Sequence, residues 1–196
     1  MKGNCRSFSL LELLLVVALV AGLIVLALNG YAALAQAAAV TSGADMVSDA
    51  LTEGRASAVA QNTTVEVRLY DLPPQPGALP VYGALQLHWL NANGTTPPVA
   101  SPVLLPAWVV IDATAAHSPI IAVNSQTATP DAGDTRLNSG TRVFHFLPDG
   151  STDLNPATNW FLTVRAATQS SPANFPSNWA CVQVDPTTGR TQIYRP

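Results

Sequence analysis

The stretch Arg6–Glu12 (RSFSLLE), followed by the apolar run Leu13–Leu28, decides how this chain is built. From Phe8 to Leu28 the chain holds about 21 residues with a single charge, and a helix needs about 20 apolar residues to cross a bilayer. That charge is Glu12, although a carboxylate inside a membrane helix costs roughly 2.5–3.5 kcal/mol on the mildest scale. An acid kept in such a place indicates a functional role for its side chain.

Charges on the two sides of the apolar run predict its orientation. Lys2 and Arg6 precede the run, and the first charge after Leu28 is Asp45. Basic residues stay on the cytoplasmic side of a membrane, so the N-terminus is expected there and the rest of the chain outside. We therefore predict four segments: a leader at 1–7, a membrane helix at 8–29, its helical continuation at 30–62 and a β-rich periplasmic head domain at 63–196.

The arrangement of basic residues, Phe8 and Glu12 resembles the prepilin signature of type IV pilins and of the pseudopilins of type II secretion. The resemblance implies that a prepilin peptidase cuts between Ser7 and Phe8, that the new amino terminus is methylated, and that Glu12 acts in filament assembly. Ser7 stands where the family usually has glycine, and Asn29 where many relatives have proline. The implied partners are the peptidase, the bacterial inner membrane, and other pilins or pseudopilins that pack through their N-terminal helices.

Two other interpretations of the N-terminal segment remain open. An ordinary secretory signal peptide could be cut after Ala35, which would leave Gln36 as the first residue, and a plain membrane anchor would stay uncut. Either one would make the protein a membrane-anchored or secreted periplasmic ligand-binding domain. A signal-peptide core is usually about 7–15 residues long, which is shorter than this run, and neither interpretation explains Glu12.

Beyond the membrane segment, apolar residues recur at helical spacing and predict an amphipathic helix. The residues of this stripe are Val47, Ala50, Leu51, Gly54 and Ala58, and the helix is expected to end at Asn62. The opposite side of this helix carries acidic residues, so it is expected to face solvent. One helix is therefore expected to run from Phe8 to about Ala60, with its second half laid on a sheet.

After Asn62 the period of the sequence changes from about 3.6 to 2. Val65, Val67 and Leu69 alternate with polar residues, which predicts a half-buried strand at 64–70. Further strands are expected at 84–90, 108–111, 119–123, 142–147, 160–165, 179–184 and 191–194, with loops at 71–80, 95–106, 124–140 and 169–178. A helix followed by strands, without βαβ alternation, predicts an α+β fold with an antiparallel sheet.

A second resemblance lies in the head and is independent of the leader. The segments Gly54–Ala56 (GRA), Phe144–Gly150 (FHFLPDG) and Asp185–Arg190 (DPTTGR) look like the GspH/FimT branch of minor pseudopilins and pilins. The ending Thr191–Pro196 (TQIYRP) also looks like a prepilin-like family of verrucomicrobial bacteria. The resemblance implies a pilin-like head in a minor subunit, within or at the tip of a type II secretion or type IV pilus-like filament. The glycines of the last two motifs are expected at positive φ.

The inventory of reactive residues argues against an enzyme. The three histidines are His88, His117 and His145, and the chain has no Gly-x-Ser-x-Gly, Ser-x-x-Lys or His-Glu-x-x-His motif. His145 lies between two phenylalanines, so it is expected on the outer face of a strand rather than in a site. We predict no enzymatic activity, no catalytic residue and no cofactor.

Other binding classes receive little support from the sequence. The net charge of −3 and the sparse basic residues do not suit nucleic acid. Asp131 and Asp134 could offer carboxylates to calcium, but a site needs more oxygen ligands than these, so a solvated loop and no metal are expected. Trp89, Trp108, Trp160 and Trp179 are expected in the core. Cys5 and Cys181 are expected on opposite sides of the membrane, with Cys181 a buried thiol that forms no disulfide.

Overall fold

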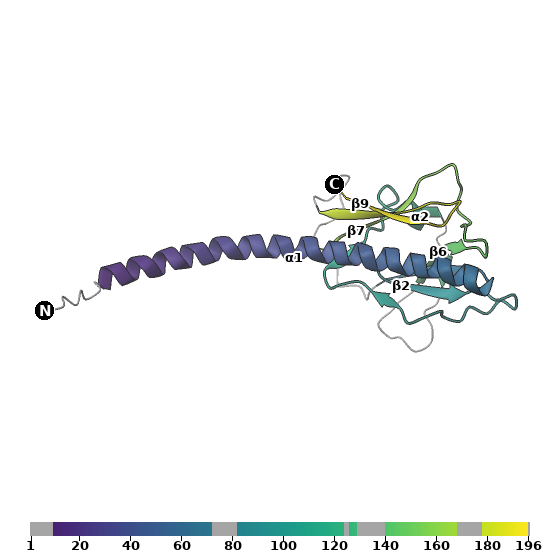
Figure 1. Cartoon of the computed structure of the whole chain (residues 1–196), viewed down its shortest axis with the longest axis horizontal. Helices are drawn as coiled ribbons and strands as arrows, with labels where there is room; N and C mark the ends of the chain where they lie inside the picture. Colours follow the sequence, from purple (N-terminus) through teal and green to yellow (C-terminus); the bar gives the residue numbers. More distant parts are fainter. Residues whose placement is uncertain (1–9, 72–81, 124–125, 129–139, 168–177, 196) are drawn as a thin grey trace, which may run out of the picture. The chain divides into compact units, whose positions relative to one another are not determined.

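The computed structural model describes residues 10–71, 82–123, 126–128, 140–167 and 178–195 (Figure 1). The chain divides into two compact units, Met1–Ala37 and Ala38–Pro196. We call the second one the head unit. Ser7 and Phe8 of the predicted processing site and the loop at 131–134 lie outside the described residues.

A single α-helix, α1 (Leu10–Gln61), accounts for the described part of the first unit and continues into the head unit. Of the helix expected from Phe8 to about Ala60, the described part from Leu10 onward is one uninterrupted helix, and Gly43 does not break it. Among the residues that the structure describes, we find no helix with the length and apolar character needed to cross a membrane.

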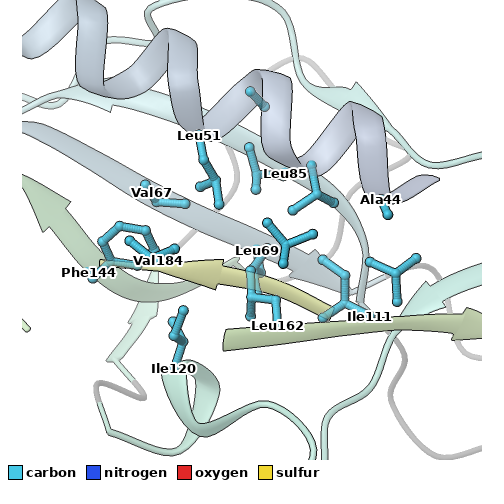
Figure 2. Close-up of a cluster of buried hydrophobic side chains, with 14 of the residues drawn as sticks. Ala44, Leu51, Val67, Leu69, Leu85, Ile111, Ile120, Phe144, Leu162 and Val184 are labelled. Atoms are coloured by element: carbon cyan, nitrogen blue, oxygen red, sulfur yellow. The ribbon is translucent and has the colours of Figure 1, made fainter. Parts of the chain in front are cut away.

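The later part of α1 packs its predicted stripe into the core of the head unit (Figures 1 and 2). All five stripe residues are buried: Val47, Ala50, Leu51, Gly54 and Ala58. Asn62 takes a left-handed φ of 47°, and the Thr63 amide donates to the Ala58 carbonyl, which closes the helix. Both the stripe and the helix end are therefore as predicted.

In the part of the head unit that the structure describes, the strands form one nine-stranded sheet, and every strand pair is antiparallel. The strands are β1 (Val65–Asp71), β2 (Tyr82–Trp89), β3 (Val103–Leu104), β4 (Val109–Ile111), β5 (Gln126–Ala128), β6 (Gly140–Phe146), β7 (Trp160–Ala166), β8 (Trp179–Val184) and β9 (Thr191–Tyr194). Their order is β5-β6-β1-β2-β4-β7-β8-β9, with β3 beside β2. Mixed α+β structure with an antiparallel sheet is thus confirmed.

The core lies between α1 and the sheet, as Figure 2 shows for Leu51 of α1 above Val67, Leu69 and Leu162. Two helical glycines allow the close approach. A Cβ on Gly43 would lie 2.7 Å from Cγ1 of Val109, and a Cβ on Gly54 would lie 3.0 Å from Cδ2 of Leu87. Gly43 costs the helix about 1 kcal/mol in intrinsic propensity relative to alanine. The close approach of β4 explains why a residue without a side chain stands at this position.

The expected strand at 119–123 is wrong, because Pro119–Val123 forms the short helix α2. The amides of His117 and Ser118 both donate to the Thr114 carbonyl, so the chain is already turning when it reaches Pro119. Proline suits the first turn of a helix, where its missing N–H is not needed. Ile120 and Ile121 are buried in this helix. A short apolar run fits a buried strand as well as a buried helix, so the sequence pattern alone could not distinguish the two.

The expected loops at 95–106 and 124–140 each contain a short strand, β3 and β5. Strands of two or three residues have too few positions to show alternation. A further correction concerns Trp108, which was expected in the core and is instead 72% exposed, whereas Trp160 is buried as expected.

Strand β1 is buried on both faces rather than half-buried. Glu66 and Arg68, which were expected to face water, are almost fully buried. The segment after β2 folds back along that strand, since the Trp89 amide donates to Pro97 and the Val99 amide to Leu87. It thereby lies beside β2, and its Thr96 reaches one of the two charges, since Nη2 of Arg68 donates to Oγ1 of Thr96 at 2.8 Å.

Candidate functional site

Glu12, the predicted assembly residue, lies in the first turn of α1 with its side chain exposed. The two processing residues, Ser7 and Phe8, precede the described part of the helix, so Glu12 lies near the N-terminal limit of the described residues.

Large apolar side chains surround this part of α1 on every side. All of the described side chains from Leu10 to Ile24 are exposed, including Leu10, Leu11, Leu14, Leu19 and Leu23. A helix that is apolar all round normally lies in a protein core or in lipid. This stretch therefore needs an apolar partner that the chain itself does not supply among its described residues.

In the head unit, Arg55 of α1 joins two turns, one after β6 and one between β8 and β9. Its Nε donates to the Gly150 carbonyl at 3.2 Å and to the Thr188 carbonyl at 2.6 Å. Gly150 lies in the turn after β6, and Thr188 lies in the hairpin between β8 and β9. Three segments that are far apart in the sequence therefore meet at one guanidinium, which we call the Arg55 junction.

Glycine is required in both turns of the junction. Gly150 has a φ of 85° and Gly189 a φ of 63°, as expected from the sequence. A Cβ on Gly189 would collide with the Gly150 carbonyl oxygen, and a Cβ on Gly150 would lie 3.2 Å from Nη2 of Arg55. The Thr152 amide also donates to the Pro186 carbonyl at 2.8 Å, so the two turns are joined directly.

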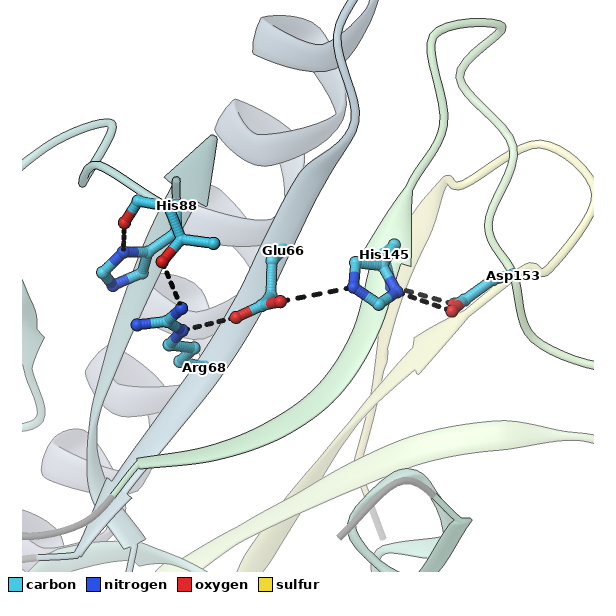
Figure 3. Close-up of polar contacts among 6 residues, drawn as sticks. Glu66, Arg68, His88, His145 and Asp153 are labelled. Carbon is cyan, nitrogen blue, oxygen red and sulfur yellow. Dashed lines mark hydrogen bonds and ion pairs between the residues drawn. The ribbon is translucent and has the colours of Figure 1, made fainter. Parts of the chain in front are cut away.

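A second polar cluster lies on the face of the sheet that points away from α1 (Figure 3). His145 contacts Asp153 through Nδ1 at 2.7 Å and Glu66 through Nε2 at 3.4 Å. Glu66 also accepts from Nε of Arg68, whose Nη2 donates to Oγ1 of Thr96 at 2.8 Å. Each buried charge in this cluster therefore has an opposite charge beside it.

His145 is held as a cation in this cluster. Hydrogen bonds to Asp153 and then to Glu66 raise its pKa to about 9, against the lowering effect of burial. An imidazolium whose two N–H groups already face carboxylates has no free nitrogen to accept a proton near neutral pH. This agrees with the expectation that His145 sits on the outer face of its strand and acts there as a structural residue.

A third group of polar residues is buried beside α2. Oδ2 of Asp112 accepts from Nε of Arg165 at 2.7 Å and lies 3.3 Å from Nδ1 of His117. Burial alone would raise the pKa of Asp112, but hydrogen bonds from Thr114 and Arg165 outweigh it and hold that pKa at about 2. An aspartate, a histidine and Ser118 thus lie close together.

This group is not arranged for nucleophilic catalysis. Ser118 is the residue directly after His117, and its Oγ accepts from the Thr163 amide at 3.0 Å. Ser118 is also fully buried, so no substrate can reach its hydroxyl. The contacts instead fasten the loop before α2 onto β7.

The remaining candidates are weak as sites. Cys181 is a free, half-buried thiol, and burial raises its pKa to about 11, so it stays protonated and unreactive. An open hollow of about 300 Å³ lies over β8 and β9, lined by Gln183, Asp185, Thr188, Arg190, Gln192 and Tyr194. In the described part of the chain, no three His, Cys, Asp or Glu side chains come together to hold a metal ion.

Sequence reasoning missed the buried ion pairs of Glu66, Arg68, Asp112 and Arg165. Glu66, Arg68 and Arg165 lie at alternate strand positions that suit solvent exposure, and Asp112 directly follows β4, so no local pattern marks them as buried. Arg55 belongs to the segment Gly54–Ala56 noted in the sequence, but its two carbonyl partners could not be predicted from the sequence.

Searches against protein-family models, curated proteins and solved structures find no match to this chain.

Proposed function

We propose that this chain is a minor pseudopilin or pilin-like structural subunit of a type II secretion or type IV pilus-like filament. The observation that carries the proposal is that one helix, α1, supplies both an exposed apolar segment with a single carboxylate and the central stripe of the head core. A subunit that packs through its helix in a filament needs the apolar segment and the segment that packs in the head on one continuous helix.

In this proposal, residues 8–29 span the bacterial inner membrane, the N-terminus faces the cytoplasm, and the pilin-like head is periplasmic. The support is the sequence from Phe8 to Leu28 and its flanking charges, part of which precedes the described residues. Prepilin peptidase cuts between Ser7 and Phe8, and the amine of Phe8 becomes methylated. The protein is then a structural subunit and not an enzyme.

Glu12 has a defined role in this assembly. Cleavage leaves a positive amine on Phe8, one helical turn before Glu12. When the helix enters an apolar bundle, the carboxylate needs a cation, and the amine of a neighbouring subunit is the one at the right depth. Removing one partner of a buried ion pair typically costs about 3–5 kcal/mol, because the other charge is left alone. The pair therefore sets the register between subunits.

The alternative is a membrane-anchored or secreted periplasmic ligand-binding domain. The observation that favours it is the polar hollow over β8 and β9, whose side chains could meet a small polar ligand. That function leaves Glu12 without a role. It also predicts a different first residue after export, either Gln36 or an uncut Met1.

The mature N-terminus tests the proposal. The full chain is expressed together with a prepilin peptidase, extracted from membranes and analysed by intact mass and N-terminal peptide mapping. We expect loss of residues 1–7 and a chain that starts at Phe8. A chain that begins at Gln36, or one that keeps Met1 in the presence of active peptidase, contradicts the proposal. Omitting the peptidase is the matched control and should leave the leader in place.

A further inference from the structure

Strand β9 forms one edge of the sheet. Among the residues that the structure describes, β9 pairs with β8 alone, because it is the last strand in the order of the sheet. A strand in this position turns half of its backbone amides and carbonyls away from its neighbour. The place of β9 in the sheet therefore leaves it able to pair with one further strand.

The register shows which residues of β9 turn their backbone outward. The Asp185 amide donates to the Arg190 carbonyl at 2.9 Å, which makes these two residues a hydrogen-bonded pair. Hydrogen-bonded and non-hydrogen-bonded pairs alternate along an antiparallel ladder. Every second residue after Arg190 therefore bonds to β8, whereas Thr191 and Ile193 turn their N–H and C=O groups to the open side.

Apart from its shortness, β9 has none of the features that usually guard an open edge. Such features are a charge, a proline or a bulge within the strand. The segment Thr191–Tyr194 (TQIY) has no charge and no proline, and its register with β8 is unbroken. Threonine, isoleucine and tyrosine favour extended structure, and Ile193 and Tyr194 are exposed. This edge is suited to pairing with another strand.

The polar hollow lies on one face of this edge. Three of its lining residues, Arg190, Gln192 and Tyr194, alternate along the chain, so their side chains share one face of the strand. The other face turns to α1, since Oγ1 of Thr191 lies 2.9 Å from Oγ of Ser48. A strand added to β9 continues both faces and places every second side chain beside the hollow.

Two exposed arginines flank β9. Within the described part of the chain, neither Arg190 nor Arg195 forms an ion pair. The acid that lines the hollow, Asp185, is engaged in its own hairpin, because its Oδ1 accepts from the amides of Thr187 and Thr188 at 2.8 and 3.1 Å. The guanidinium of Arg190 is thus available to a carboxylate from outside.

The same charges disfavour a second copy of the chain as the added strand. Antiparallel pairing of β9 with itself would bring the flanking arginines of the two copies close together, Arg190 of one near Arg195 of the other. Like charges across a ladder are destabilising, whereas opposite charges stabilise it. The charge of this edge therefore favours an acidic partner.

We propose that β9 accepts an extended, acidic segment of another protein as a further antiparallel strand, with carboxylates beside the polar hollow. Main-chain bonds to Thr191 and Ile193 hold the segment, and Arg190 selects carboxylates at alternate positions. The side chains in between lie on the face of Ile193, where apolar residues fit. This surface belongs to the head unit and does not depend on the membrane anchoring proposed above.

A short peptide of alternating glutamate and valine is the probe. Its fluorescein-labelled form is titrated with the full chain in detergent, and binding is followed by fluorescence anisotropy. We expect saturable binding, and at least roughly tenfold weaker binding of the matched lysine–valine peptide. A glutamate–valine peptide with methyl groups on alternate amide nitrogens should also bind poorly, because it loses main-chain donors.

Variants of the protein locate the contact. Ile193→Pro removes an outward amide but keeps the bonds of β9 to β8, so we expect a folded protein that no longer binds. Arg190→Glu should reverse the preference and bind the lysine–valine peptide better, which an unfolded variant cannot do. Ala92→Glu is the control and should bind as the native chain does, because this exposed position follows β2, which β4, β7 and β8 separate from β9.

Four outcomes overturn the proposal. They are absence of binding by the native chain, equal binding of the acidic and basic peptides, and unchanged binding in both Ile193→Pro and Arg190→Glu. The fourth is self-association of the native chain that is lost in Ile193→Pro, which assigns the edge to a second copy. None of these results bears on cleavage before Phe8, so the proposed function stands or falls separately.

Discussion

The guanidinium of Arg55 donates to the Thr188 carbonyl at 2.6 Å, which ties the last third of α1 to the closing hairpin of the sheet. The same nitrogen donates to Gly150 at 3.2 Å, so one side chain holds the helix, the turn after β6 and the final hairpin together. Ser48 of α1 also contacts Thr191 of β9 at 2.9 Å, and Val182 and Val184 of β8 lie in the core, so Arg55 is one of several contacts that attach β8 and β9 to the helix. The junction is therefore a place where a single substitution should loosen the head.

Replacing Arg55 by methionine keeps the apolar stem and removes both hydrogen bonds. Bonds from a charged donor contribute roughly 1.5–3 kcal/mol, so we expect the free energy of unfolding to fall by about that amount. Urea denaturation of the full chain in detergent measures it. Arg195→Met, at an exposed position, is the control and should change stability by less than about 0.5 kcal/mol. Equal stability of both variants would show that Arg55 is dispensable.

Gly189→Ala should destabilise the head far more than Gly94→Ala. Both glycines have positive φ, of 63° and 79°, so both substitutions carry the backbone cost of roughly 1–2 kcal/mol. Only at Gly189 would the new Cβ also collide with the Gly150 carbonyl, whereas nothing lies within 4 Å at Gly94. Thermal unfolding of the two variants side by side gives the comparison. Similar melting temperatures would mean that the two turns do not touch.

Leu51→Asp should unfold the head unit. Leu51 is fully buried in the stripe of α1, and an unpaired carboxylate in such a place costs several kcal/mol. Ala56→Asp, on an exposed position of the same helix, is the control and should leave the near-ultraviolet circular dichroism unchanged. A Leu51→Asp protein with the native spectrum and melting temperature would refute the packing of this stripe.

His145 should make stability depend on pH above neutrality. Its folded pKa is raised from 6.5 to about 9, so the folded state binds the proton more tightly than the unfolded state. The resulting stabilisation, on the order of 3 kcal/mol, is fully present below pH 6.5 and is lost as the pH rises to about 9. Urea denaturation across this range should show the decline in the native chain and a nearly flat profile in His145→Gln. Parallel profiles would mean that the imidazole does not pair with Asp153 and Glu66.

Long periodic elements of this fold could be predicted from the sequence, and short or folded-back ones could not. The stripe of α1 and the strand β8 follow from their spacing, because a core imposes it on every turn or every second residue. Pro119–Val123 is one turn long, so its apolar residues fit helix and strand equally, and the preceding bonds to Thr114 decide the outcome.

The polar contacts also could not be predicted from the sequence, because they form only in the tertiary structure. Glu66 and Arg68 alternate with valines as surface residues do, but in the folded protein they form a buried ion pair. The glycines at 150 and 189 were predictable as turn residues. Their contact with each other and with Arg55 was not, since it joins segments that no local pattern relates.

Glu12 carries the central claim, and subunit crosslinking of Glu12→Ala tests it most directly. Cells that make the filament express either the native chain or the variant, each with a photoreactive amino acid at the exposed position Leu19 of α1, and light traps neighbouring subunits. Glu53→Ala, which removes an exposed acid from the later part of the same helix, serves as the control. We predict that Glu12→Ala is inserted and cut at Phe8 but crosslinks to its neighbours at least tenfold less than the native chain and Glu53→Ala. Crosslinking of correctly cut Glu12→Ala at the native level would contradict the account.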